Sequence, residues 1–302
     1  MSFTNYLLSK GFSTSTAQGY NNDVNRFKEW LKKENMRVDM VVYADVIHYV
    51  HYLKAKAKKQ SRSVRIHSVK HYFDYLISVN EVTENPASSI VLKGGKRRTL
   101  HNILSKQELE NIYHSFELKT KEDKNNLSRY TPSVLTFERN KIIVGLMIYQ
   151  GLSSVDLGNL GLKDLKLREG KVFIPASRRS NQRELTLEAV QIMDLMEYTL
   201  KTREQIRKEQ HKESDKLIIS TGSGEKINNT LSSLVKKLRI QNKNIVSLKQ
   251  IRASVITHWL KQYNLREVQY MAGHRYVSST EAYFINDLEG LSEDITKFHP
   301  LG

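Results

Sequence analysis

The chain has 302 residues, with 48 lysines and arginines against 32 aspartates and glutamates, so its formal net charge is +16. This excess of positive charge favours a polyanionic partner, nucleic acid first of all, and a chain of this length holds one large or two modest domains. The absence of cysteine excludes disulfide bonds and thiolate metal sites. Because no stretch is apolar enough to span a bilayer and the N-terminus lacks a secretory signal pattern, we expect a cytoplasmic protein without a membrane partner.

Residues 1–92 carry apolar side chains at helical spacing and predict a wholly helical domain, with helices over 16–33, 44–56 and 62–79. Basic side chains crowd the end of the second of these helices and the start of the third: Lys54, Lys56, Lys58, Lys59, Arg62 and Arg65. A basic helix face is often merely solvated, but this layout suits a grip on phosphates, so we favour contact with DNA.

A basic linker is predicted at residues 93–101. Two glycines disfavour a helix there, and the cations at Lys96, Arg97 and Arg98 would not pack into a core. We interpret the segment as a flexible connector that crosses a DNA backbone. A patch resembling a nuclear-localisation signal is the alternative.

Residues 102–302 predict a second domain, and the chain as a whole is expected to be mainly α with a small β-sheet, in the α+β class. Ser105 and Glu108 are spaced as a capping box at the start of a helix. Short strands at 171–175 and 184–187 flank a polar turn. The other predicted elements are a polar loop over 117–133, helices over 137–150, 189–208 and 227–239, and a strand over 217–221.

Residues near the C-terminus suggest a chemical function. Lys249 and Arg252 are three apart and share one helix face, so they can approach one anion together. The next short helix ends at Gly273, His274 follows directly, and Tyr283 comes nine positions later. Attack on a phosphodiester needs a hydroxyl nucleophile, positive charge for the phosphorane oxygens and a proton donor. Each residue alone has a plainer interpretation, as packing or as a solvated helix face.

This ordered set resembles the C-terminal signature of the tyrosine recombinases, or phage-type integrases, with Ala272 in place of the usual leucine before Gly-His. The N-terminal segment resembles the core-binding domain of the same family. The resemblance implies that Tyr283 is the nucleophile and forms a 3′-phosphotyrosine bond, with Arg252, His274 and Lys249 at the phosphate. It also implies that no metal or nucleotide cofactor is needed, and that a homotetramer acts on double-stranded DNA recombination sites. In such a tetramer the segment at about 287–302 would dock on a neighbouring subunit.

The sequence departs from the family pattern at two positions. Ser153 stands where the family has a phosphate-binding arginine, and it offers only a neutral hydroxyl. Arg178 stands where the hairpin normally supplies a lysine as general acid, and arginine is a poor proton donor that still stabilises charge. Arg179 is the alternative, because one sequence does not fix the register of the hairpin. Lys249 is a possible replacement acid if it is partly buried among cations. Arg139 is a possible source of the missing charge, although we expect it to be solvated.

Three functions are consistent with these features. The first is a site-specific recombinase, as the integrase or transposase of a mobile element. The second is a degenerate recombinase that binds DNA as an accessory or regulatory protein without cutting it. The departures from the family pattern at Ser153 and Arg178 are the evidence for this function. The third is a type IB topoisomerase, which shares the chemistry but which the N-terminal domain does not resemble.

Overall fold

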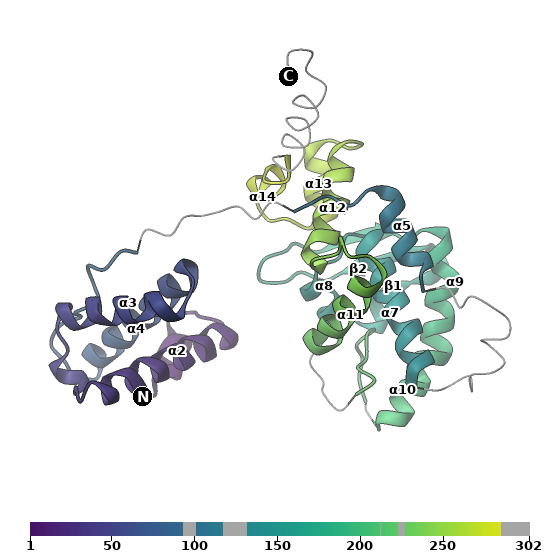
Figure 1. Ribbon diagram of the computed structural model, residues 1–302. Coiled ribbons are helices and arrows are strands. Elements are labelled where there is room, and N and C mark those ends of the chain that lie inside the picture. Colours follow the sequence, from purple (N-terminus) through teal and green to yellow (C-terminus); the bar gives the residue numbers. More distant parts are fainter. Residues whose placement is uncertain (93–100, 117–131, 212, 223–226, 285–302) are drawn as a thin grey trace, which may run out of the picture. The chain divides into compact units, whose positions relative to one another are not determined.

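The computed structural model describes residues 1–92, 101–116, 132–211, 213–222 and 227–284 (Figure 1). The chain divides into two compact units, Met1–Arg98 and Thr99–Gly302. Of the predicted linker only His101 lies in the described ranges. Lys96, Arg97 and Arg98 lie outside them, as do residues 287–302 and most of the loop predicted over 117–133.

The first unit is helical, as expected. Helix α2 packs against α1 and α4, and α3 packs against α4. Phe27 lies at the centre of this core, with its ring edge-to-face on Tyr49 and on Phe73. The helices, with a short 3-10 turn, are α1 (Phe3–Ser9), α2 (Thr14–Lys33), η1 (Val38–Met40), α3 (Tyr43–Lys56) and α4 (Lys59–Ser78). Helix α4 begins at Lys59 rather than at the predicted residue 62, so the basic cluster continues into its first turn.

The second unit is mainly helical with one small sheet, which confirms the predicted fold class (Figure 1). Helix α7 is its centre, because α5, α9, α10 and α12 all pack against it. Its helices are α5 (Lys106–His114), α7 (Pro132–Ile148), α8 (Ser154–Asn159), α9 (Ala189–Glu197), α10 (Arg203–Gln210), α11 (Ile227–Gln241), α12 (Leu248–Leu260), α13 (Leu265–Ala272) and α14 (Val277–Glu281), with shorter turns η2 (Leu162–Asp164), η3 (Leu167–Glu169) and π-helical η4 (Tyr198–Thr202). The capping box predicted at Ser105 and Glu108 is formed. No helix in the described ranges is both long and apolar enough to cross a membrane.

The sheet is an antiparallel meander of β1 (Leu165–Lys166), β2 (Lys171–Ile174) and β3 (Arg183–Thr186). Val172 pairs with Leu185, and Ile174 pairs with Arg183. The two predicted strands are confirmed, and the short β1 adds a third. The register fixes where the hairpin places its side chains, because Arg183 then points to the same buried face as Val172 and Ile174.

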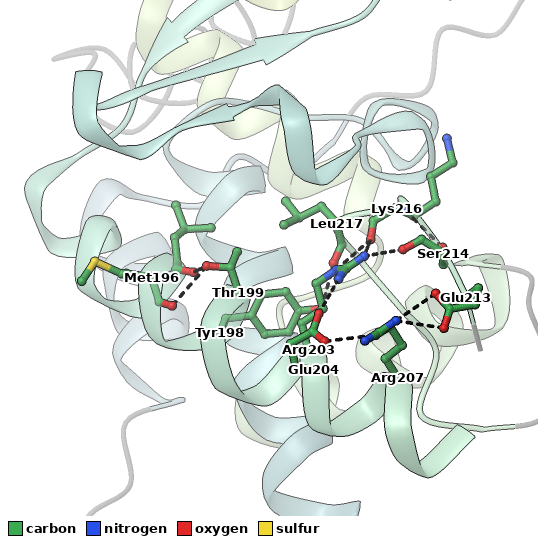
Figure 2. A network of polar contacts seen from close by, with 11 residues as sticks. Met196, Tyr198, Thr199, Arg203, Glu204, Arg207, Glu213, Ser214, Lys216 and Leu217 are labelled. Atoms are coloured by element: carbon green, nitrogen blue, oxygen red, sulfur yellow. Dashed lines mark hydrogen bonds and ion pairs between the residues drawn. The ribbon is translucent and has the colours of Figure 1, made fainter. Parts of the chain in front are cut away.

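The strand predicted over 217–221 is wrong. These residues form no ladder, and only an isolated bridge joins Gly161 to Lys216. Their apolar side chains are buried as a strand's would be, but side chains from the helices bond to backbone carbonyls at residues 214–217 (Figure 2). The Tyr198 hydroxyl donates to the Leu217 carbonyl at 3.0 Å, and Arg203 donates to the carbonyls of Ser214 and Lys216. A sequence pattern reports burial, but not which partner takes the backbone hydrogen bonds.

Arg139 belongs to the same region and corrects another expectation. It is not solvated but 3% exposed. Its guanidinium donates to the Thr221 hydroxyl at 3.1 Å and to the Asn140 side chain at 3.0 Å. Arg139 therefore holds the 217–221 segment.

Removal of the Tyr198 hydroxyl should destabilise the second unit. In Tyr198→Phe the buried Leu217 carbonyl loses its partner, so the free energy of unfolding should fall by about 1–2 kcal/mol. The chain has two tryptophans, Trp30 in the first unit and Trp259 in the second. Urea unfolding followed by fluorescence in a Trp30→Phe background therefore reports the second unit alone. Tyr263→Phe, at a tyrosine that is 46% exposed, is the matched control, and equal stability of the two variants would contradict the assignment.

Candidate active site

Arg252 is the central cation of the site and lies on α12. The helix begins at the Ser247 cap and buries Ile251, Val255 and Ile256, which leaves the Arg252 side chain mostly buried at the edge of the core, with 13% exposure. Its guanidinium donates to the carbonyl of Gly151 and, at 2.7 Å, to the carbonyl of Ala272. Arg252 therefore connects the end of α13 with the turn that precedes α8.

The turn at Gly273 sets the position of His274. Gly273 ends α13 in the left-handed region, with φ of +70°, as predicted for a helix stop. The His274 amide then donates to the Gln269 carbonyl at 3.0 Å. A Cβ at position 273 would lie 2.3 Å from Nη1 of Arg183, so only glycine permits this close approach of backbone and guanidinium.

His274 connects the cation to the tyrosine. Its ring stacks on Tyr283, with 5.7 Å between centroids and 12° between planes. Its Nε2 lies 3.5 Å from Nη2 of Arg252, and its Nδ1 lies 2.9 Å from Oγ1 of Thr280. Burial, followed by the charges of Arg252 and Arg183, lowers the pKa of His274 to about 4. The imidazole is therefore neutral at neutral pH.

The phenol of Tyr283 lies near the same guanidinium. Burial lowers the pKa of Arg252, while the neighbouring groups of Asp156 and Tyr283 act to raise it. Tyr283 is partly buried, and its amide donates to the Thr280 carbonyl at 3.0 Å. Arg252, His274 and Tyr283 thus meet at one place, with the phenol beside a positive charge able to stabilise a phenolate or a phosphorane oxygen.

In the part of the chain that the structure describes, Lys249 and Arg178 do not contact the cluster of Arg252, His274 and Tyr283. Lys249 is exposed and lies near His101, whose pKa is lowered by burial and then by the Lys249 charge. The partial burial on which the replacement-acid hypothesis depends is therefore not met. Arg178 is exposed in the turn between β2 and β3. That turn nevertheless reaches the site through its backbone, since the Asn181 amide donates to the Gly273 carbonyl at 2.9 Å.

Two residues that sequence reasoning missed lie beneath the site. Asp156 is 2% exposed, and its Oδ2 lies 3.1 Å from Nη2 of Arg183 and 3.7 Å from Nη1 of Arg252. Burial acts to raise the pKa of Asp156, but Arg183 and hydrogen bonds from Ser153 bring it below the usual value. Arg183, with a fully buried side chain, also donates from Nε to the Met271 carbonyl at 2.8 Å. The spacing of Ser153 and Asp156 is that of a capping box, so the sequence could have indicated that Asp156 is engaged at a helix start. No pattern in the neighbouring sequence indicates that Arg183 is buried.

Ser153 has a structural role in place of the expected arginine. It is the N-cap of α8, and its hydroxyl donates to Oδ2 of Asp156 at 2.8 Å. The hydroxyl is therefore engaged by the carboxylate. With His274 neutral, the buried group of Arg183, Arg252 and Asp156 carries one net positive charge.

The basic side chains of the first unit differ in how available they are. Lys54, Lys58 and Lys59 are exposed. Lys56 is also exposed but its Nζ lies 2.9 Å from the Tyr52 hydroxyl. Arg62 is half-buried, and Arg65 lies 3.7 Å from Asp23 in an ion pair. The exposed side chains of Lys54, Lys58 and Lys59 are thus better placed to bind a polyanion than the ion-paired Arg65.

Known proteins resemble this chain over both units. The profile described as Phage integrase, N-terminal SAM-like domain matches residues 1–80, and that of the Phage integrase family matches residues 104–289. The chain belongs to the phage integrase family. Its N-terminal match also decides against the type IB topoisomerase interpretation.

Relatives within the phage integrase family are distant but nearly full-length. Tyrosine recombinase XerC of Thermodesulfovibrio yellowstonii is 26% identical over 311 residues, covering 99% of this chain and 95% of the relative. Tyrosine recombinase XerD of Oceanobacillus iheyensis is 24% identical, covering 97% and 95%. The XerH recombinase bound to palindromic difH shares the fold, with a TM-score of 0.68, 18% identity and coverage of 93% and 79%.

Gly273→Ala should destabilise the second unit strongly. The left-handed backbone costs about 1 kcal/mol for alanine, and displacement of the buried Arg183 guanidinium from its partners should bring the loss to about 3–4 kcal/mol. Gly170→Ala separates the two effects, because Gly170 has φ of +62° but its Cβ would make only an ordinary contact at 3.9 Å. Urea unfolding of both variants measures the difference, and equal losses would show that Arg183 does not fill the space.

The stability of the second unit should depend on pH through His274. Its folded pKa of about 4 lies below the ordinary value of 6.5, so the unfolded chain binds the proton first. The contribution is complete above pH 6.5 and is lost as the pH falls towards about 4. Urea midpoints measured across this range should fall more steeply for the native sequence than for His274→Gln. Parallel curves would contradict the buried neutral imidazole.

Proposed function

We propose that this integrase-family chain is a site-specific DNA recombinase that cuts and rejoins DNA through a 3′-phosphotyrosine bond at Tyr283. The observation that carries the proposal is the stacking of the His274 ring on the Tyr283 phenol, while Nε2 of the same ring faces the Arg252 guanidinium at 3.5 Å. The relatives named XerC and XerD, which match nearly the whole chain, support the same reaction class.

The proposed reaction exchanges one phosphodiester for another. The Tyr283 oxygen loses its proton and attacks the scissile phosphorus, and the bond to the 5′ oxygen breaks as that oxygen gains a proton. Arg252 lowers the barrier by stabilising the charge on the phosphorane oxygens, with His274 beside it. The covalent link preserves the bond energy, so religation by a 5′ hydroxyl needs no nucleotide and no other cofactor. Lys249 and Arg178 would add positive charge when DNA brings a phosphate to the site.

Double-stranded DNA is the proposed partner, held by both units. Exposed Lys54, Lys58 and Lys59 support contact with phosphates, joined by Lys56, Arg62 and Arg65 of the same cluster. The linker cations Lys96, Arg97 and Arg98 would cross the backbone. A protein that binds cellular DNA must share a compartment with it, and for this reason we propose a cytoplasmic location.

We further propose a homotetramer on DNA, with residues at about 287–302 docking on a neighbouring subunit. A lambda integrase tetramer bound to a Holliday junction shares the fold, with a TM-score of 0.60 and 13% identity. We propose the integrase or transposase of a mobile element as the biological setting. Inverted repeats in the flanking genomic sequence would support that setting.

A degenerate, non-cutting DNA-binding protein is the second candidate, and one observation favours it. The Ser153 hydroxyl is engaged by Asp156, so the site lacks the charge that the family pattern supplies at this position. Against it, the imidazole still stacks on the phenol and faces the guanidinium, an arrangement that binding alone does not require.

Covalent capture separates the two candidates. Nicked duplexes prepared from the genomic DNA that flanks the coding sequence should form an adduct with the native protein, because the nicked strand diffuses away after cleavage and prevents religation. Denaturing gels and mass spectrometry of the Tyr283 peptide measure the adduct. Tyr283→Phe should abolish it, whereas Tyr276→Phe, at a tyrosine that is 70% exposed, should retain it. DNA binding without any adduct would overturn the proposed cleavage in favour of the accessory role.

A further inference from the structure

Thr280 is a fully buried polar residue that the proposed reaction does not use directly. It lies on α14, with 0% exposure, and its Oγ1 is 2.9 Å from Nδ1 of His274. The same residue accepts a hydrogen bond from the Tyr283 amide through its carbonyl, at 3.0 Å. One threonine therefore contacts both the imidazole and the residue that bears the phenol.

The surroundings of His274 define its tautomer in the DNA-free protein. A neutral imidazole has one N–H and one lone pair, whereas a guanidinium has donors only. Nε2 faces Nη2 of Arg252 at 3.5 Å, so it must present its lone pair. The proton then lies on Nδ1 and is donated to Oγ1 of Thr280.

A phosphodiester in the site reverses this requirement. Phosphate oxygens are acceptors only, so an imidazole that bonds to one through Nε2 must carry its proton there. The charged groups around the ring are Arg252 from α12, Arg183 from β3 and Asp156 from α8, with the Tyr283 phenol stacked on its face. In the DNA-free protein, burial and the two arginines lower the pKa of His274 to about 4. A ring that stays neutral beside the phosphodiester must therefore change tautomer.

We propose that Thr280 is a positioning residue whose rotatable hydroxyl holds the His274 ring in both tautomers, accepting from Nδ1 without DNA and donating to it when a phosphodiester faces Nε2. This inference rests on the proposed recombinase function. One proton leaves Nδ1 to water and one is taken from water at Nε2, so the imidazole stays neutral. A hydroxyl fits this role because it is both donor and acceptor, and it turns without moving the ring.

Two substitutions at Thr280 test the proposal. Thr280→Ser keeps the hydroxyl, and Thr280→Val keeps the shape of the side chain without it. In the free protein, nitrogen-detected NMR of the His274 ring should show the proton on Nδ1 in the native and serine forms. The valine form should give mixed tautomer signals. Identical ring signals in the native and valine forms would overturn the assignment, whatever the activity of the protein.

The adduct-forming rate gives the second readout. Loss of one buried hydrogen bond should slow covalent capture on the nicked duplexes by roughly ten-fold in Thr280→Val. Thr280→Ser should stay within about two-fold, with equal DNA affinity for all three proteins. A serine form as slow as the valine form would show that packing, not the hydroxyl, matters. Absence of an adduct with the native protein would instead refute the proposed function, while the ring signals still decide the role of Thr280.

Discussion

The site depends on a buried carboxylate held between two guanidinium groups. Asp156 contacts Arg183 and lies near Arg252, and together these residues connect α8, β3 and α12. Arg183 and Arg252 also donate to the carbonyls of Met271 and Ala272, so the end of α13 is fixed to the same cluster. Ion pairs of this kind contribute little to net stability but are costly to break from one side, because the remaining charge is then buried alone. The cluster therefore specifies the geometry of the turn on which His274 lies.

The serine at position 153 shows how the fold uses a residue that departs from the family pattern. As an N-cap it satisfies the first turn of α8 and shares Asp156 with Arg183. Compared with the arginine of the family pattern, Ser153 removes one positive charge, so the buried part of the site keeps a single net positive charge. The two further cations that the sequence predicted for the site, Lys249 and Arg178, are exposed. In our proposal Lys249 and Arg178 move towards the scissile phosphate only when DNA binds. The site is therefore completed during DNA binding.

Local signals were enough to predict much of this architecture. The capping box at Ser105, the helix stop at Gly273 and the two long strands depend on neighbouring residues, and all of them occur. The basic cluster and the ordered set from Lys249 to Tyr283 pointed to the family for the same reason, because their spacing can be read along one or two helices.

The errors came where distant residues decide the outcome. Residues 217–221 have the composition of a strand, but Tyr198 and Arg139 take hydrogen bonds that a neighbouring strand would otherwise take. Arg139 was expected in solvent because an arginine is rarely buried. Its partner Thr221 lies 82 positions away in the sequence. Arg183 escaped notice for the same reason, since its partners come from α8 and α13.

The β2–β3 turn contacts the site through its backbone and not through its side chains. The Asn181 amide bonds to the carbonyl of Gly273, directly before His274, while Arg178 and Arg179 are exposed. The hairpin and the turn that carries His274 are therefore joined directly through the backbone, so a shift of the hairpin at Asn181 would also move the support of the imidazole.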